Sequence, residues 1–278
     1  MPSKPLRIAT INANGIRAAF RKGMGAWLDG RDVDILAIQE VRASTDDLQQ
    51  LFGDEWDIVH DPATAKGRAG VAIASRHRAA IHRVELGPTE FDSAGRWLEA
   101  DYEVNGTVVT VVSTYVHSGE AGTDKQVEKY RFLDAMEARL PQLQKHSELA
   151  VVLGDLNVGH RTLDIKNWKG NVKKAGFLPE ERAYFDRFLG AEGDSRYNAG
   201  AGLGWVDVGR RHAGETEGPY TWWSWRGKAF DNDSGWRIDY QLVTPALAER
   251  VKDYAVDRAD AYDERWSDHA PVVVDYAV

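Results

Sequence analysis

The chain has 278 residues, of which 43% are hydrophobic and 28% charged, a balance typical of soluble globular proteins. It contains no cysteine, which excludes disulfides, thiolate zinc sites and cysteine nucleophiles. The formal net charge of −8 argues against a polyanionic partner. A divalent metal held by acidic groups would make the local electrostatic potential positive in spite of the net charge. Lysines also cluster between residues 166 and 174, so basic residues are concentrated locally.

The length favours one large domain over residues 1–278. No apolar run approaches the roughly 20 residues that a bilayer-spanning helix needs. Residues 1–11 lead directly into a strand, without the charged and apolar regions of a secretory signal. We therefore expect a cytoplasmic protein with no membrane segment.

The first half of the chain alternates apolar strands with short helices. We expect strands over residues 7–12, 33–38, 58–60 and 70–75, and helices over residues 18–28 and 45–51, the second capped by Ser44. Residues 96–104 and 107–115 flank Asn105-Gly106, the strongest hairpin signal in the chain.

The second half begins with a long helix over residues 125–143, whose apolar positions recur at helical spacing. Residues 159–179 are expected to be irregular and residues 193–219 to form a glycine-rich loop. The remaining segments are expected to be strands over residues 150–153, 220–226, 236–243 and 271–276, and helices over residues 179–189 and 245–250. Strands joined partly by helices and partly by hairpins indicate a layered, mixed α/β fold.

The most informative stretch is residues 150–158, A-V-V-L-G-D-L-N-V. Its apolar run is typical of a strand buried on both faces. Asp155 and Asn157 follow two positions apart, so on extended backbone they point to the same side. Taken alone, an Asp-rich turn with a local backbone hydrogen bond explains this pattern equally well.

Polar side chains at the ends of other strands favour a site. These residues are Asn12, Asn14, Glu40, Tyr115, Asp155, Asn157, Asp239, Asp268 and His269. Strands of one α/β sheet would bring them to a common edge. Carboxylate and amide oxygens suit Mg²⁺ or Mn²⁺, and a histidine beside an acid suits proton transfer or contact with a phosphate. The set predicts metal-assisted hydrolysis of a phosphate ester.

Six motifs in order, T-I-N-A-N-G, I-Q-E-V-R, T-Y-V-H-S-G, G-D-L-N-V, G-W-R-I-D-Y and S-D-H-A-P-V, resemble the exonuclease III family of AP endonucleases, within the endonuclease/exonuclease/phosphatase superfamily. The resemblance runs from Ile8 to Val274. G-W-R-I-D-Y and residues 163–182 are specific to the DNA-repair branch. The resemblance implies a four-layered α/β sandwich, with two mixed β-sheets face to face and helices outside, forming a single catalytic domain.

The resemblance also implies roles for these residues. Metal binding, by Mg²⁺ with Mn²⁺ as the alternative, falls chiefly to Glu40, with Asn14 and Asp268 in support. Asp155 would orient or deprotonate the attacking water. The sequence leaves open whether Asp155 or His269 is the base, and we favour Asp155 because His269 works better as a cation on the phosphate.

The other catalytic positions would hold the reacting groups. Asn157 and Asn12 would hold Asp155 and the phosphate in place. His269, held by Asp239, would contact a non-bridging phosphate oxygen. Tyr115 would face the phosphate or the leaving oxygen.

Aromatic residues carry the substrate prediction. Trp222, Trp236 and Ile238 match the family's small apolar pocket, which accepts a base-free sugar and excludes an intact nucleotide. The alternative is that residues 220–226 are core and edge packing. Candidate backbone-phosphate contacts are Arg42, Arg68, Lys125, Lys173, Arg226 and Lys228.

We therefore predict a monomeric, Mg²⁺-dependent AP endonuclease that cuts 5′ to an abasic site and leaves a 3′-hydroxyl, with 3′→5′ exonuclease and 3′-end repair activity. Its partner would be double-stranded DNA with abasic sites or blocked 3′ ends. Two alternatives stay open: another phosphodiesterase of the superfamily, acting on lipid, inositol phosphate or RNA, and a non-catalytic protein that binds DNA damage.

Overall fold

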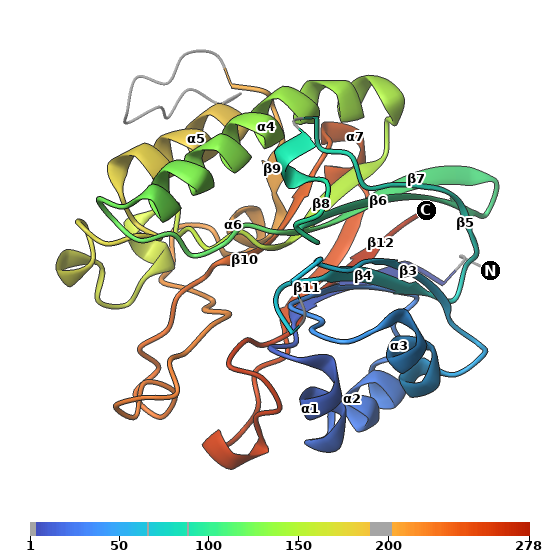
Figure 1. Cartoon of the computed structure of the whole chain (residues 1–278), viewed down its shortest axis with the longest axis horizontal. Helices are drawn as coiled ribbons and strands as arrows, with labels where there is room; N and C mark the ends of the chain where they lie inside the picture. The colour runs from blue at the N-terminus through green and yellow to red at the C-terminus, as the bar shows by residue number, and fades with distance from the viewer. Residues whose placement is uncertain (1–3, 66, 88, 190–201) are drawn as a thin grey trace.

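The computed structural model describes residues 4–65, 67–87, 89–189 and 202–278. Two six-stranded sheets pack face to face, with helices on their outer surfaces (Figure 1). Both sheets are mixed, because β1 pairs with β2 in parallel and β7 with β8 in parallel among otherwise antiparallel neighbours. This arrangement confirms the predicted four-layered sandwich. Within the described residues, no helix has the length and apolarity to cross a membrane.

The first sheet has the strand order β11-β12-β1-β2-β4-β3. Its strands are β1 (Leu6–Asn12), β2 (Ile35–Gln39), β3 (Asp57–Asp61), β4 (Val71–Ser75), β11 (Val251–Val256) and β12 (Val272–Tyr276). Its outer face is covered by α1 (Ile16–Arg21), α2 (Met24–Arg31) and α3 (Thr45–Phe52) (Figure 1). The helix expected over residues 18–28 is in fact two helices, because Gly23 takes a φ of 116° between them. Ser44 caps α3 as predicted, in a capping box with Asp47.

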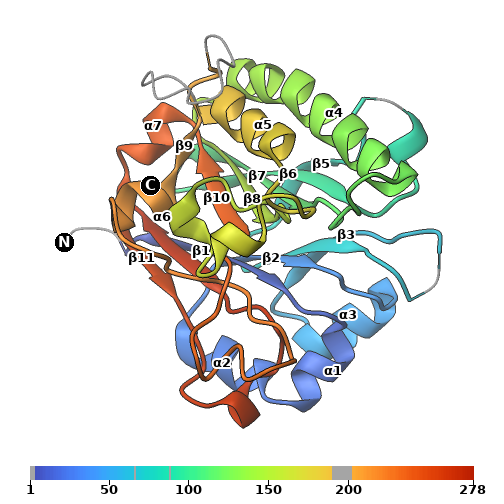
Figure 2. The same ribbon diagram turned by 90° about the vertical axis from the view of Figure 1, so that its left-hand side faces the viewer.

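The second sheet has the order β5-β6-β7-β8-β10-β9. Its strands are β5 (Ala79–Arg83), β6 (Trp97–Val104), β7 (Thr107–Tyr115), β8 (Ala150–Asp155), β9 (Val206–Asp207) and β10 (Asp239–Val243). Helices α4 (Asp124–His146) and α5 (Pro179–Leu189) lie side by side over its outer face (Figure 2). The shorter helices α6 (Val208–Ala213) and α7 (Pro245–Ala248) flank β9 and β10.

The inner faces of the two sheets bury one apolar core, which includes Ile8, Ile73, Val111 and Leu153. Toward the carboxyl ends of β2 and β8 the two sheets approach closely. Gly154 has a φ of 144°, and a Cβ there would lie 2.0 Å from the carbonyl oxygen of Thr114, so only glycine fits. The residue that breaks the apolar run of β8 is therefore required by packing just before Asp155.

Several expected elements differ from the structure. Residues 220–226 form no strand and make only isolated bridges at Trp222, and the strand expected from residue 236 begins at Asp239. The glycine-rich loop expected over residues 193–219 contains β9 and α6, while residues 190–201 lie outside the described part. The sequence analysis also missed β5 and β11, two edge strands whose mixed exposure hides the alternation of apolar and polar residues.

Candidate active site

The predicted residues meet where strand ends of both sheets converge. Asn12 ends β1, and its Nδ2 atom donates to Glu40 Oε1 and to Asp155 Oδ2, each at 2.9 Å. Glu40 follows β2 of the first sheet and Asp155 ends β8 of the second. One amide therefore links two acids that are 115 residues apart in the sequence, across the two sheets.

Three of these residues have left-handed backbone conformations. The φ angles are 48° at Asn14, 49° at Glu40 and 49° at Asn157. Asparagine tolerates this region, whereas it is uncommon for glutamate. Each residue lies just after a strand, so the chain turns sharply and aims the side chain across the sheet edge. Such strained positions concentrate at functional sites.

Asp155 is buried and accepts hydrogen bonds on both oxygens. The Asn157 backbone N–H donates to Oδ1 at 2.9 Å, and the Asn157 side chain donates to Oδ2 at 3.0 Å. Burial raises the pKa of Asp155 to about 8; Asp239 and Glu40 add to the rise, while His269 and Asn12 oppose it. Burial is therefore the main reason that the charged form of Asp155 is disfavoured, and the neighbouring acids add to it.

His269 lies between two of the acids. Its Nδ1 atom is 2.9 Å from Asp239 Oδ2, and its Nε2 atom is 3.7 Å from Asp155 Oδ2. Burial lowers the pKa of His269, but the carboxylates of Asp239 and Asp155 outweigh that effect and raise it to about 10. The imidazole is therefore a cation at neutral pH, held by Asp239 with its second nitrogen toward Asp155.

Thr221, which the sequence analysis missed, fixes Asp239 in turn. Its hydroxyl donates to Asp239 Oδ2 at 2.6 Å and accepts the backbone N–H groups of Ile238 and Asp239, both at 3.1 Å. In the sequence, Thr221 is marked only by its place among the aromatic residues 220–226, and that place does not indicate that its hydroxyl binds an acid.

Glu40, Asn14 and Asp268 lie on the first-sheet side of the site. Asn14 Nδ2 donates to Asp268 Oδ1 at 2.9 Å, and the guanidinium of Arg42 contacts Glu40 Oε2. Carboxylate and amide oxygens are the hard donors that divalent cations such as Mg²⁺ prefer. These donors, close to the buried carboxyl groups of Asp155 and Asp239, fit a divalent cation.

Among the described residues, Asp155, Asp239 and His269 form a group whose metal-ligating atoms lie within 4.8 Å of one another. In that group His269 Nδ1 is engaged by Asp239, and Asp155 accepts hydrogen bonds on both oxygens. The carboxylate oxygens of Glu40 and Asp268 are engaged as well, by Asn12 and Arg42 and by Asn14 and Trp222 respectively, so both sets of residues offer candidate ligands.

Tyr115 ends β7 opposite Asp155 in the parallel pairing of β7 with β8. Burial, with the charges of Glu40 and Asp155 nearby, raises the pKa of Tyr115 well above its ordinary value, so the phenol keeps its proton and can donate a hydrogen bond. The guanidinium of Arg96 lies 4.9 Å from the centre of its ring. Arg96 escaped the sequence analysis because it precedes its strand as an ordinary loop cation.

The three predicted pocket residues lie together beside His269. Trp222 forms isolated bridges with both Trp236 and His269, and the two indole rings meet edge to face with centroids 6.1 Å apart. Trp222 and Trp236 are half-buried, while Ile238 is buried. Trp223 instead belongs to a local core, so the alternative of simple packing holds for that residue.

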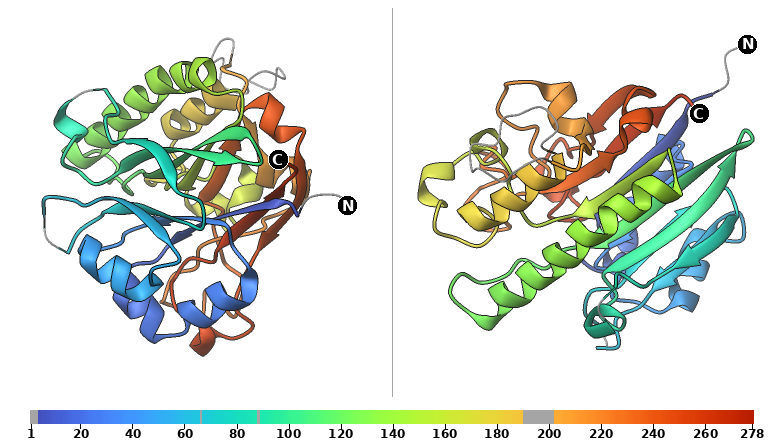
Figure 3. Two further views of the ribbon diagram at one scale, coloured as in Figure 1. Left: turned by 90° about the vertical axis from the view of Figure 1, so that its right-hand side faces the viewer. Right: turned by 90° about the horizontal axis from the view of Figure 1, so that it is seen from above.

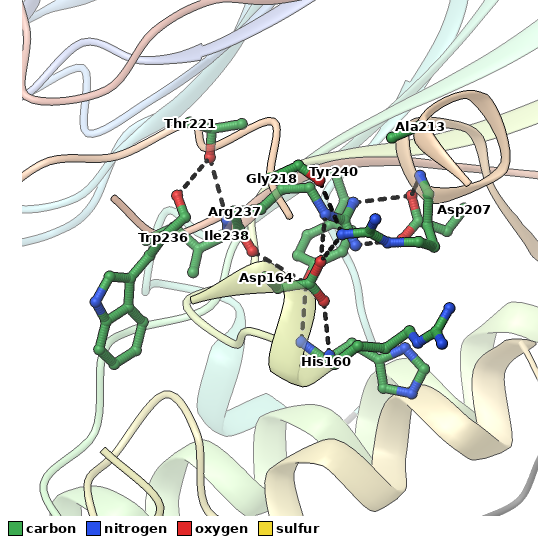
Figure 4. Close-up of polar contacts among 12 residues, drawn as sticks. His160, Asp164, Asp207, Ala213, Gly218, Thr221, Trp236, Arg237, Ile238 and Tyr240 are labelled. Atoms are coloured by element: carbon green, nitrogen blue, oxygen red, sulfur yellow. Dashed lines mark hydrogen bonds and ion pairs between the residues drawn. The ribbon is translucent and has the colours of Figure 1, made fainter. Parts of the chain in front are cut away.

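A buried network of charged residues holds the segment that carries Trp236, Ile238 and Asp239 (Figure 4). Arg237 donates to Asp164 Oδ1 at 2.8 Å and to the two oxygens of Asp207 at 3.0 and 2.7 Å. Arg210 also pairs with Asp164 Oδ1. The buried ion pairs of Arg237 therefore fix the backbone that carries the neighbouring side chains of Trp236 and Ile238.

The predicted phosphate contacts Arg68, Lys125 and Arg226 are exposed side chains. Lys125 pairs with Glu120 at 2.9 Å. Within the described residues, none of the three forms a hydrogen bond with the residues gathered at the strand ends, so the structure does not bring them into direct contact with the candidate site.

Comparison with known proteins gives consistent matches along the chain. Residues 9–269 match the endonuclease/exonuclease/phosphatase family. The chain is 31% identical over 268 residues to an exodeoxyribonuclease of Bacillus subtilis (strain 168), covering 96% of this chain and 98% of that protein. Its fold is similar to that of a 3′ phosphatase from Neisseria bound to a product DNA hairpin (TM-score 0.83, 28% identity, 98% of this chain and 99% of that one). It is also similar to an AP endonuclease from Archaeoglobus fulgidus (TM-score 0.81, 30% identity, 98% and 100% covered).

Proposed function

The chain belongs to the endonuclease/exonuclease/phosphatase family, and we propose that this DNA-repair nuclease incises double-stranded DNA 5′ to an abasic site, leaving a 3′-hydroxyl. The observation that carries the proposal is the gathering of Asp155, Asp239 and His269, whose carboxylate and imidazole atoms lie within 4.8 Å of one another, with Glu40 linked to Asp155 through Asn12. These are the groups that hydrolysis of a phosphodiester requires at one place.

Asp155 would accept the proton of the attacking water. Its two oxygens are held by Asn12 and Asn157, so the carboxylate is fixed before substrate arrives. His269 would remain a cation and donate from Nε2 to a non-bridging phosphate oxygen, while Asp239 holds Nδ1. This division of roles follows from the order of the two pKa values: that of His269 is raised to about 10, so the imidazole keeps its proton at neutral pH, whereas that of Asp155 is lower, about 8, and a cation held at Glu40 would lower it further.

Negative charge that develops on the phosphate would be stabilised by hydrogen-bond donors that are already in position. The imidazolium of His269 and the phenol of Tyr115 are placed before reaction, while the amide of Asn157 holds Asp155, and such preorganisation is usually the largest catalytic contribution. Glu40, with Asn14 and Asp268, would hold a divalent cation, Mg²⁺ or Mn²⁺. When bound, that cation would neutralise negative charge on the phosphate oxygens.

The pocket of Trp222, Trp236 and Ile238 would select the substrate. An abasic sugar can leave the helix at low cost because it has no base to unstack or unpair. The two half-buried indoles, which meet edge to face, would form the walls of this pocket. The 3′ phosphatase among the similar structures favours 3′-end repair as a further activity, alongside 3′→5′ exonuclease action.

Beyond the site, we propose that residues 1–278 act as a single catalytic domain, as a monomer in the cytoplasm. Both sheets contribute residues to one site, which supports the single domain.

A cleavage assay tests the proposal directly. A duplex with one tetrahydrofuran abasic analogue, labelled at its 5′ end, is incubated with the protein and Mg²⁺ or Mn²⁺, with and without EDTA. We expect one incision immediately 5′ to the analogue, abolished by EDTA and absent from an undamaged duplex. An intact duplex after long incubation with either metal would refute the proposal.

The same assay separates the alternatives. Binding of the abasic duplex without incision would favour a non-catalytic damage-binding protein. Hydrolysis of an RNA strand or an inositol phosphate, with no incision of abasic DNA, would favour another phosphodiesterase of the family.

A further inference from the structure

A buried lysine lies behind the active site. Lys129, in the second turn of α4, has a side chain that is 0% exposed. Its Nζ atom donates to Glu181 Oε1 at 2.6 Å, to the Asn157 carbonyl oxygen at 2.8 Å and to the Ser118 carbonyl oxygen at 3.2 Å. These three acceptors match the three N–H donors of an ammonium group. Nothing in the proposed mechanism uses this cation.

The two carbonyl acceptors belong to the loops that carry catalytic groups. Ser118 lies three residues after Tyr115, in the loop that follows β7, and Asn157 lies in the loop that follows β8. The two loops also contact each other, because Asn157 Nδ2 donates to the Val116 carbonyl oxygen at 2.8 Å. Lys129 therefore ties both loops to α4, which runs across the outer face of the second sheet (Figure 3).

Glu181, in α5, holds the lysine in this position. Its Oε1 atom also accepts from Gln126 Nε2 at 3.0 Å, and its Oε2 atom accepts from the Leu178 N–H at 2.9 Å. The carboxylate is fully buried like its partner, so it compensates the ammonium charge and aligns it from the side opposite the loops.

The loop after β7 packs closely on this lysine. Gly119 has a φ of 73°, and a Cβ there would lie 2.5 Å from Gln126 Oε1 and 3.0 Å from Lys129 Cδ. The backbone next to Ser118 thus rests on the side chains of α4 with no space for a methyl group. A shift of Lys129 must therefore move this loop.

We propose that Lys129, held by Glu181, is a positioning residue for the hydrolysis, an inference that rests on the proposed function. The coupling runs through Asn157, whose carbonyl accepts from Lys129 while its N–H and side-chain amide donate to Asp155. Asn157 keeps a left-handed backbone, with a φ of 49°, only because its surroundings hold it there. Without the ammonium, Asn157 relaxes, and Asp155, which the Asn157 N–H and side-chain amide hold, loses its alignment with the phosphate.

A purely structural role would have a different signature. A lysine that only stabilises the fold would affect turnover in proportion to the fraction of unfolded protein. A positioning residue lowers the rate of the chemical step in protein that is fully folded and binds DNA normally. The test must therefore separate turnover, DNA affinity and stability.

The decisive variant is the double substitution Lys129→Met/Glu181→Gln. It removes both buried charges together, so neither is left uncompensated, and glutamine can still accept from the Leu178 N–H. Leu140→Ala is the matched control, since it truncates a fully buried side chain of the same helix, 11 residues after Lys129 in the sequence. Lys145→Met controls for the loss of an exposed lysine from α4.

Each variant is assayed below its Tm on the tetrahydrofuran duplex for the single-turnover rate at saturating enzyme and for DNA Kd. We expect the double variant to lose at least tenfold in rate with Kd within twofold, and both controls to retain the wild-type rate. Lys129→Arg, which keeps a charged donor, should recover at least threefold over the double variant. A double variant that is folded and within twofold of the wild-type rate would overturn the proposal.

Hydrogen exchange gives a readout independent of activity. Peptides that cover residues 115–119 and 155–158 should exchange faster in the double variant than in Leu140→Ala at equal Tm. Unchanged exchange in both peptides contradicts the positioning role even if the wild-type protein does not cut abasic DNA. A wild type that fails to incise overturns the proposed function, whereas a wild type that incises beside an equally active double variant overturns only the role of Lys129.

Discussion

Asp155 and Asp239 lie directly opposite each other in the antiparallel pairing of β8 with β10. Two carboxylates in this relation normally destabilise a sheet. Here His269 Nδ1 lies 2.9 Å from Asp239 Oδ2 and His269 Nε2 lies 3.7 Å from Asp155 Oδ2, so one imidazolium compensates negative charge on both acids. The two carboxylates therefore have different hydrogen-bond partners. Asp239 is engaged by His269 and Thr221, whereas Asp155 accepts from Asn12 and Asn157 at the edge of the sheet.

Asp155→Asn tests the assignment of the base. The amide keeps the shape of the side chain but cannot accept a proton from water, so the single-turnover incision rate should fall by about 10²- to 10⁴-fold. DNA Kd should change by less than about threefold, since the contacts to the DNA backbone remain. Asp54→Asn, which alters an exposed acid remote from the site, serves as the control. An Asp155→Asn enzyme that keeps most of its rate would transfer the role of base to another group.

The pH dependence of incision should have two limbs. The base must be unprotonated, so the rate rises with pH through the pKa of Asp155, which burial raises to about 8. The imidazolium must keep its proton, so the rate falls again above the pKa of His269, raised to about 10 mainly by Asp239 against the opposing effect of burial. The two apparent values belong to the coupled set of groups.

Asp239→Asn should move both limbs to lower pH, because Asp239 raises the pKa of His269 and also adds to the rise in the pKa of Asp155. Removing the carboxylate that stabilises the imidazolium lowers the pKa of His269, so the rate should begin to fall at a pH lower by about one unit or more. The measurement is the single-turnover rate from pH 6 to 10.5 at constant ionic strength. An alkaline limb that stays in place in this variant would show that a group other than His269 sets it.

The residues of the candidate site were predictable because each lies at or near the end of a strand, and the strands are strongly patterned. Asp155 and Asn157 come two apart after a wholly apolar run, and Asn12 and Glu40 come after similar runs. Two parallel pairings then bring these ends to one edge. Local sequence therefore carried most of the information that positions the catalytic groups.

The supporting residues were not predictable in the same way. Arg237 and Lys129 look like ordinary solvated cations, and their acidic partners lie 73 and 52 residues away in the sequence. The aromatic residues 220–226 favour a strand by propensity, but their backbone groups pair at single points with Trp236 and Asp268 instead of a continuous neighbour. Only the tertiary fold decides such pairings.

Trp236→Ala tests the pocket. Removing the indole widens the space beside Trp222, so cleavage at an abasic site relative to an intact nucleotide should fall by about tenfold, near the 1.4 kcal/mol that one lost apolar contact of this kind is worth. The ratio is measured on matched duplexes in one competition assay. Trp56→Ala, at a buried tryptophan on the far side of the first sheet, should leave the ratio unchanged. Unaltered preference in Trp236→Ala would remove this residue from the specificity pocket.

Arg237→Met tests the network that anchors the pocket segment. Arg237 and Asp164 are both completely buried, and although burial raises the pKa of Asp164, the guanidinium groups of Arg237 and Arg210 hold it well below its usual range. Loss of Arg237 leaves Asp207 without its cation, so the free energy of unfolding in urea should fall by about 3 to 5 kcal/mol. Arg211→Met, which breaks an exposed pair with Glu249, should cost less than about 1 kcal/mol.

A second substitution shows whether the uncompensated charge is the cause. Asp207→Asn removes that charge and still accepts the N–H of Arg210 at the start of α6, as the carboxylate does at 3.1 Å. The double variant Arg237→Met/Asp207→Asn should therefore be more stable than Arg237→Met alone by about 1 kcal/mol or more. Equal stability of the two variants would mean that Arg237 acts through its packing and not through its charge, because only the charge on Asp207 differs between them.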